Sequence, residues 1–183
     1  MHIDHELGLL TNIDFHASPN QDVRPSTDDI SGIVIHNISL PPGEFGGGWI
    51  DDLFLNKLDS QAHPYFKEIS ELKVSAHILI RRSGEIIQYV PFHQRAWHAG
   101  ASSWDGRERC NDFTIGIEME GCDEQTFEKV QYHQLSEVIK ALCDTYPELN
   151  TKRLKGHQDI APERKTDPGP CFDWPHLTEL LKS

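Results

Sequence analysis

The chain has 183 residues, which suits one globular domain and leaves little room for two. Lys and Arg together number 17 against 29 Asp and Glu, and this net charge of −12 argues against nucleic acid or an anionic membrane surface as the main partner. Histidine is abundant at 11 residues, and the hydrophobic fraction of 37% is sufficient for a core.

The four cysteines show no Cys-x-x-Cys spacing, which argues against a zinc ribbon or a thioredoxin-type motif. We expect them to be reduced thiols that behave as small apolar residues. Residues 1–6 lack the basic and apolar regions of a signal peptide, and no apolar run approaches the roughly 20 residues that span a bilayer. The expected location is therefore the cytoplasm, with no membrane partner.

Strand and helix patterns alternate along the chain. Residues 1–30 are polar and punctuated by proline, which predicts an irregular N-terminal arm that wraps around the domain. A β-branched run at 32–36 predicts a buried strand. The later expectations are helical patterns within 49–72, a hairpin of strands at 75–81 and 85–90, an aperiodic surface loop at 93–112, a strand at 113–120, a helix at 128–146, an extended segment at 154–157 and a terminal helix from Trp174.

The strand at 113–120 has one apolar and one polar face. Its apolar residues are Phe113, Ile115, Ile117 and Met119, and they alternate with Thr114, Gly116, Glu118 and Glu120. Together the patterns predict a single α/β or α+β domain, with a mixed β-sheet flanked by helices. Residues 31–176 would form its core and residues 1–30 its arm.

Three polar residues stand where apolar patterns end. His36 ends the first predicted strand, His157 ends the extended segment, and Asp167 follows ten residues later, just before Pro168 and Pro170. Two imidazoles and one carboxylate can bind a cation such as zinc and leave a fourth position open, as in catalytic sites. Because the chain has 11 histidines, a surface or hydrogen-bonded core role stays open for each of them.

Two further residues could act beside such a cation. Glu118 lies on the polar face of its strand, where a raised pKa would suit a general base, and a solvated strand face is the alternative. Lys165 lies two residues before Asp167 and could stabilise an oxyanion. His77 is expected to form core hydrogen bonds, while His98 could face a ligand.

Six segments, in order along the chain, resemble the AmpD amidase family, which is related to lysozyme-type phage amidases and peptidoglycan recognition proteins. The segments are Val74–His77, Arg95–Gly100, Gly106–Phe113, Gly116–Glu118, Gly156–His157 and Arg164–Pro170. The resemblance extends from about Gly32 to Trp174 and implies a peptidoglycan-recognition-protein-like fold with a zinc groove on one face.

The resemblance also implies a chemistry. It implies a zinc-dependent amidase that cleaves the bond between (1,6-anhydro)-N-acetylmuramic acid and the L-alanine of the stem peptide, in cytoplasmic peptidoglycan recycling. We expect a monomer that acts on a small-molecule substrate. The implied residues are His36, His157 and Asp167 as ligands of one Zn²⁺, Glu118 and Lys165 as the catalytic pair, and Asn37, Tyr65, Trp97 and Arg109 in the substrate groove.

Two other functions stay open from the sequence. An amidase of polymeric peptidoglycan would need export, and a non-catalytic muropeptide sensor would lack a zinc ligand. The proposed substrate carries carboxylates, so we also expect a locally basic groove, with Arg109, Lys165 and the zinc ion as its positive charges.

Overall fold

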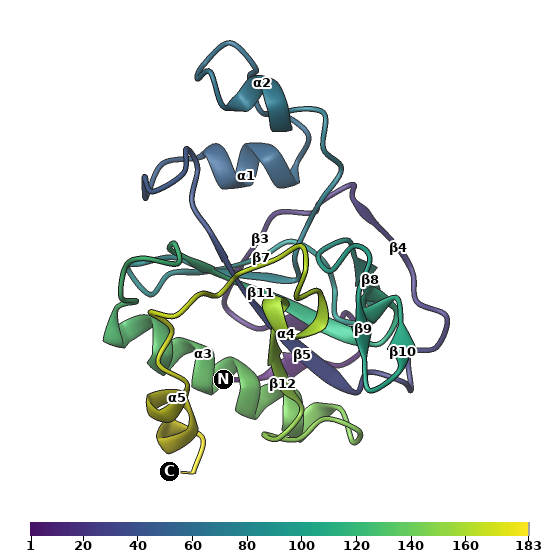
Figure 1. The fold of residues 1–183 in the computed structure, drawn as a ribbon. Helices are drawn as coiled ribbons and strands as arrows, with labels where there is room; N and C mark the ends of the chain where they lie inside the picture. The colour runs from purple at the N-terminus through teal and green to yellow at the C-terminus, as the bar shows by residue number, and fades with distance from the viewer. Residues whose placement is uncertain (183) are drawn as a thin grey trace.

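A six-stranded mixed sheet forms the centre of the computed structural model, which describes residues 1–182 (Figure 1). In sheet order its strands are β12 (Leu154–Gly156), β5 (Gly32–Ile38), β11 (Thr114–Glu120), β6 (Ile78–Ile80), β7 (Ile86–Gln88) and β3 (Asp14–Phe15). The first four of these run parallel to one another, β7 is antiparallel to β6, and β3 is parallel to β7. The predicted mixed sheet and the predicted hairpin are confirmed.

The N-terminal segment is more regular than its composition predicts. Within residues 1–30, β1 (Ile3–Asp4) pairs with β2 (Leu9–Leu10), β3 joins the edge of the central sheet, and β4 (Gln21–Val23) pairs with β8 (Gln94–Ala96). The expectation of an irregular arm is therefore wrong for these residues. The strands are only two or three residues long, and β3 and β4 pair with distant segments, so they leave no local period in the sequence.

The segment at 93–112 also differs from the aperiodic surface loop that we expected. It contains β8, the ribbon of β9 (Ser103–Trp104) with β10 (Arg107–Glu108), and a 3-10 helix at Cys110–Asp112. Ala99, Trp104 and Cys110 are buried, and they pack with Val34 of β5. Much of this segment therefore covers the sheet.

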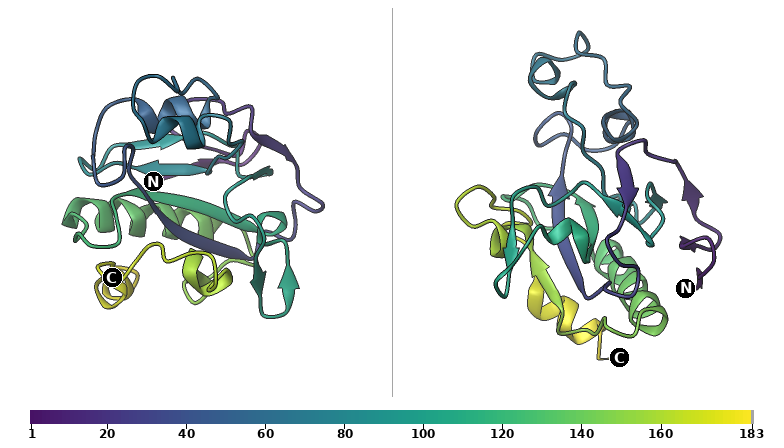
Figure 2. Two further views of the ribbon diagram at one scale, coloured as in Figure 1. Left: turned by 45° about the horizontal axis from the view of Figure 1, so that its top comes forward. Right: turned by 90° about the vertical axis from the view of Figure 1, so that its right-hand side faces the viewer.

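Helices cover both faces of the sheet (Figures 1 and 2). Their bounds are α1 (Trp49–Phe54), α2 (Phe66–Ile69), α3 (Lys129–Thr145), α4 (His157–Ile160) and α5 (Trp174–Leu180). The helices predicted at 128–146 and from Trp174 are confirmed by α3 and α5. A reciprocal cap starts α3, in which the backbone N–H of Glu128 donates to Oε1 of Gln131 at 2.9 Å. None of the helices in residues 1–182 is long and apolar enough to cross a membrane.

The two faces of β11 bury different kinds of side chain. Ile115 and Ile117 are fully buried against Leu135 of α3. Each such side chain stabilises the fold by about 1.5–3 kcal/mol. Glu118 projects from the opposite face into a cavity beside α1 and α2. The predicted alternation is thus confirmed, and it separates the core from the polar face.

A buried arginine ties the N-terminal segment to the sheet. Arg24 is 3% exposed, and its guanidinium donates to the backbone carbonyls of Phe92 (3.0 Å), Asn111 (2.9 Å), Asp112 (3.3 Å) and Thr114 (2.7 Å). Burial lowers the pKa of Arg24 to about 10, so the side chain stays protonated at neutral pH. One cation therefore satisfies four carbonyl groups from two separate stretches of chain, at Phe92 and at 111–114.

We predict that Arg24→Lys lowers the free energy of unfolding by on the order of 3 kcal/mol, measured by urea unfolding followed by circular dichroism. A compact ammonium cannot reach acceptors that are spread around a planar guanidinium, so buried carbonyls lose their partners. The matched control is Arg109→Lys, because Arg109 is 70% exposed and should change stability by less than about 1 kcal/mol. Equal effects of the two substitutions would contradict this role of Arg24.

Candidate active site

His36 and Glu118 lie side by side on the polar face of the sheet, because β5 and β11 pair in parallel with these two residues as register partners. Both side chains are buried. Strand β5 does not end at His36 as predicted, since it continues through Ile38, which pairs with Glu120. His36 therefore projects from within a paired strand, which fixes its backbone on both sides.

His157 and Asp167 reach the same place from another part of the chain. Strand β12 ends at Gly156, so His157 is the first residue of α4 and not the last of a strand as predicted. The loop that carries Asp167 returns to this helix, where its carbonyl oxygen accepts from the backbone N–H of Gln158 at 2.9 Å. The pairing of β12 with β5 then brings this unit beside His36.

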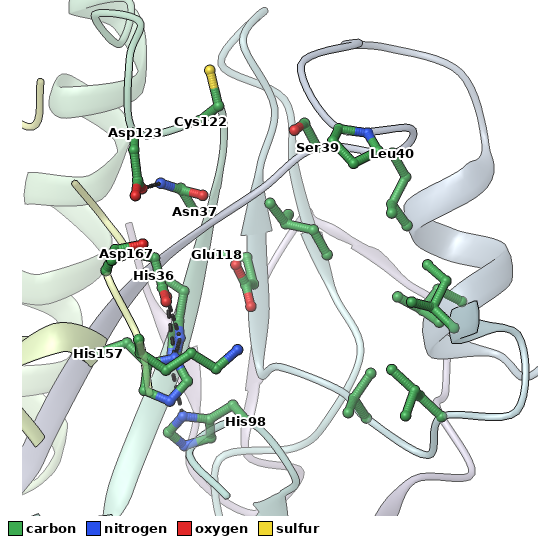
Figure 3. Close-up of a pocket in the computed structure, with 18 of the residues that line it drawn as sticks. His36, Asn37, Ser39, Leu40, His98, Glu118, Cys122, Asp123, His157 and Asp167 are labelled. Carbon is green, nitrogen blue, oxygen red and sulfur yellow. Dashed lines mark hydrogen bonds and ion pairs between the residues drawn. The ribbon is translucent and has the colours of Figure 1, made fainter. Parts of the chain in front are cut away.

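The three predicted ligand atoms form a nearly equilateral triangle (Figure 3). Nδ1 of His36 lies 2.9 Å from Nδ1 of His157, and both nitrogens lie 3.1 Å from Oδ2 of Asp167. Ligand atoms at about 2.0–2.1 Å from a tetrahedral zinc ion are separated by roughly 3.3 Å. Within residues 1–182, no other group of three His, Cys, Asp or Glu side chains brings its ligand atoms together in this way.

The protonation of the two imidazoles fits a cation at the centre of this triangle. Nε2 of His157 lies 3.1 Å from the carbonyl oxygen of Ala99, to which only a protonated nitrogen can donate. In the neutral ring, the atom that then carries the lone pair is Nδ1, which faces Asp167. Burial lowers the pKa of His36 to about 4, so this ring is neutral at pH 7. Neutral imidazoles and a carboxylate are the forms that bind zinc, so this donor set fits the ion.

Glu118 projects into the same cavity as the three ligand residues (Figure 3). It is 9% exposed, and its Oε2 has no hydrogen-bond partner among the described residues. Burial raises the pKa of Glu118 well above its ordinary value, the negative charge of Asp167 raises it further, and the positive charge of Lys165 lowers it. A buried carboxylate with a free oxygen is suited to accept a proton.

Lys165 lines the cavity beside these groups. Within the described chain, its ammonium has no ion-pair or hydrogen-bond partner. Its positive charge lowers the pKa of both Glu118 and His36, which places it within electrostatic reach of both. Lys165 is thus a cation available to a ligand in the cavity.

The cavity has a volume of about 730 Å³, and three of the four predicted groove residues line it: Asn37, Tyr65 and Trp97. The amide of Asn37 donates to Oδ1 of Asp123 at 2.6 Å and to the carbonyl oxygen of Pro168 at 3.1 Å, so it also supports the loop that follows Asp167. Arg109 lies outside the lining. It follows β10 on a solvent-facing turn and pairs with Asp112 at 3.2 Å.

The expectation of a locally basic groove is wrong for the protein's own charges. Carboxylates outnumber cationic side chains in the lining. The carboxylates are Glu118, Asp123, Glu124 and Asp167, and the cations are Arg164 and Lys165. Any positive potential in this cavity therefore depends on an added cation.

His98 contacts the candidate metal site directly, although the sequence placed it only in a loop that could face a ligand. It is buried, and its Nδ1 lies 3.0 Å from Nε2 of His36. Its ring packs over Gly116, where an added Cβ would lie 2.4 Å from the ring. A glycine within a strand is a signal of such close packing, and it could have identified His98. His77 forms core hydrogen bonds as expected, since its Nδ1 accepts from the backbone N–H of Gly116.

Comparisons with known proteins agree with this geometry. Residues 26–170 match the family model described as N-acetylmuramoyl-L-alanine amidase. The chain is 57% identical to the 1,6-anhydro-N-acetylmuramyl-L-alanine amidase AmpD of Escherichia coli, over 96% of each chain. It is 53% identical to AmpD of Haemophilus influenzae, over 98% of this chain and 97% of the relative.

Two solved structures show the same fold. A crystal structure of an AmpD selenomethionine derivative aligns with a TM-score of 0.95 at 56% identity, over 99% of each chain. The Escherichia coli amidase AmiD, in complex with anhydro-N-acetylmuramic acid-L-Ala-D-γ-Glu-L-Lys, aligns with a TM-score of 0.61 at 30% identity, over 87% of this chain and 60% of that one. The chain therefore belongs to the N-acetylmuramoyl-L-alanine amidase family, within the group of AmpD 1,6-anhydro-N-acetylmuramyl-L-alanine amidases.

Proposed function

We propose that this protein hydrolyses the amide between 1,6-anhydro-N-acetylmuramic acid and the L-alanine of a stem peptide, as a zinc enzyme of cytoplasmic peptidoglycan recycling. The observation that carries the proposal is the triangle of His36, His157 and Asp167 beside Glu118 in one cavity. Further support comes from two relatives whose structures hold such substrates: AmiD with the tripeptide above, and Pseudomonas aeruginosa AmpDh3 with an anhydromuramic pentapeptide.

The three ligand residues would hold the zinc ion through Nδ1, Nδ1 and Oδ2. When bound, zinc supplies a Lewis acid for the carbonyl oxygen and lowers the pKa of water towards about 7. The pairing of β5 with β11 fixes the backbone of His36, and the hydrogen bond from the backbone N–H of Gln158 to the carbonyl of Asp167 ties the other two ligand residues together. The complete ligand set disfavours the alternative of a non-catalytic sensor.

Glu118 has the position and environment of the general base. Its free Oε2 accepts a proton from water as the water oxygen attacks the lactyl carbonyl carbon. The same carboxyl then gives this proton to the alanine nitrogen as the C–N bond breaks. The products are a carboxylic acid on the sugar and a free amine on the peptide, and Glu118 returns to its starting state.

Lys165 and the apolar wall of the cavity complete the proposed site. The Lys165 ammonium stabilises the oxyanion that forms on the carbonyl oxygen. Tyr65 and Trp97 offer aromatic surfaces to the substrate. Asn37 acts chiefly by supporting the loop of Asp167, and Arg109 would meet only a substrate that extends beyond the cavity. We propose that a single copy of the chain is sufficient for this reaction.

We predict that the purified protein converts a soluble anhydro-muropeptide into anhydro-N-acetylmuramic acid and a free stem peptide, as identified by mass spectrometry. A chelator should abolish product formation, and added zinc should restore it. Intact sacculi serve as the competing substrate in a parallel assay and should release peptide much more slowly. Faster release from sacculi would overturn the recycling role, and full activity after verified metal removal would overturn the zinc assignment.

We predict that Glu118→Gln lowers kcat by about 10²- to 10⁴-fold, because the amide keeps the shape of the side chain but cannot accept the proton. Zinc content, measured by elemental analysis, should be unchanged. Because burial raises the pKa of Glu118, wild-type kcat/KM should fall as the pH decreases through that raised value. The residual activity of the variant should lack this acidic limb, and a limb that persists in the variant would assign it to another group.

We predict that Lys165→Ala lowers kcat by about a hundredfold or more and retains zinc, because one stabilising charge for the oxyanion is lost. Steady-state kinetics and elemental analysis provide the two measurements. Lys152→Ala is the matched control, since Lys152 is exposed and lies outside the cavity lining. Near-normal turnover of Lys165→Ala would refute the catalytic role of Lys165.

A further inference from the structure

The dipeptide His98–Ala99 contacts both candidate histidine ligands on the side away from the triangle. Nδ1 of His98 lies 3.0 Å from Nε2 of His36 (Figure 3). The carbonyl oxygen of Ala99 lies 3.1 Å from Nε2 of His157. Two neighbouring residues thus provide one contact to each imidazole. The two rings are therefore linked to the same short stretch of backbone.

Asn111 fixes this dipeptide from behind. Its Oδ1 accepts from the backbone N–H of His98 at 3.1 Å and from that of Ala99 at 2.8 Å. On the other side, the ring of His98 fills the space over Gly116, where no side chain larger than hydrogen fits. The backbone and the ring of His98 are therefore both held.

A chain of hydrogen bonds determines which nitrogen of His98 carries the proton. The carbonyl oxygen of Cys110 can only accept, so the hydroxyl of Thr114 donates to it, at 2.7 Å. The Thr114 oxygen must then accept from Nε2–H of His98, at 3.3 Å. A neutral imidazole that donates from Nε2 bears its lone pair on Nδ1, and this atom of His98 faces Nε2 of His36.

The donor and acceptor roles in this series of hydrogen bonds also determine the tautomers of the two ligand histidines. Because Nδ1 of His98 accepts, Nε2 of His36 donates, and Nδ1 of His36 presents a lone pair towards Asp167. The Ala99 carbonyl imposes the same tautomer on His157. Arg164 also donates to this carbonyl, at 2.7 Å, and the two donors can use its two lone pairs.

We propose that His98, the Ala99 carbonyl and Asn111 form a positioning shell that fixes both imidazoles as Nε2–H tautomers with Nδ1 directed at the cation. This inference rests on the metal site of the proposed function. His98 acts through His36, so it is a positioning residue and not a catalytic one. Loss of such a partner of a metal ligand typically costs 10- to 100-fold in metal affinity.

The test compares zinc affinities measured by competition with a chromophoric chelator. His98→Phe fills the space over Gly116 but offers no acceptor to His36, and it should weaken zinc binding by about 10- to 100-fold. His98→Asn keeps an acceptor near the position of Nδ1 and should recover most of the affinity. His133→Asn is the control, because His133 is exposed on α3 and should bind zinc like the wild type. The Co²⁺ absorption spectrum should change in His98→Phe alone.

The outcomes separate this inference from the function on which it rests. If the wild type binds no zinc, the metal site itself fails. If the wild type binds zinc and folded His98→Phe matches its affinity and Co²⁺ spectrum, the positioning shell is refuted. A second measurement covers the case in which His98→Phe does not fold. Ring ¹⁵N shifts of the zinc-free wild type should show Nε2–H tautomers for His36, His98 and His157, and an Nδ1–H tautomer at any of the three would overturn the proposal.

Discussion

The parallel register between β5 and β11 is the constraint on which the rest of the structure depends. It sets His36 beside Glu118 on one face of the sheet, while Ile35 and Ile117 pair on the face that packs against α3. A shift of one residue would exchange the two faces and bury the polar pair in the core. The hydrophobic packing that stabilises the domain therefore also aligns the candidate base with the first ligand.

The candidate metal site also holds three electron-rich atoms close together in a largely buried place. Nδ1 of His36, Nδ1 of His157 and Oδ2 of Asp167 lie within 3.1 Å of one another, although like partial charges repel. Strand pairing, the start of α4 and hydrogen bonds on the far sides of both rings oppose this repulsion. A divalent cation converts it into attraction, which is the reason that the site suits zinc.

Local patterns in the sequence predicted the central hairpin, α3 and the two faces of β11, because these depend on periodicity within one segment. They also pointed to His36 and His157, although neither residue ends a strand, and the family resemblance added the groove residues. The contributions of Ala99 and Asn111 could not be predicted, because their hydrogen bonds join segments that no local period connects. For Arg109, the resemblance predicted a position in the groove, but the side chain lies outside the cavity and pairs with Asp112.

The excess of carboxylates in the cavity lining has a consequence for the order in which ligands bind. The substrate of the proposed function is itself anionic, so these carboxylates would repel it, whereas the two positive charges of the proposed zinc ion would bring the cavity close to neutrality. Under the proposed function, metal loading would therefore precede substrate capture. Unloaded molecules would not sequester muropeptide from loaded ones, so metal supply would set the number of working enzymes without turning the remainder into competitors.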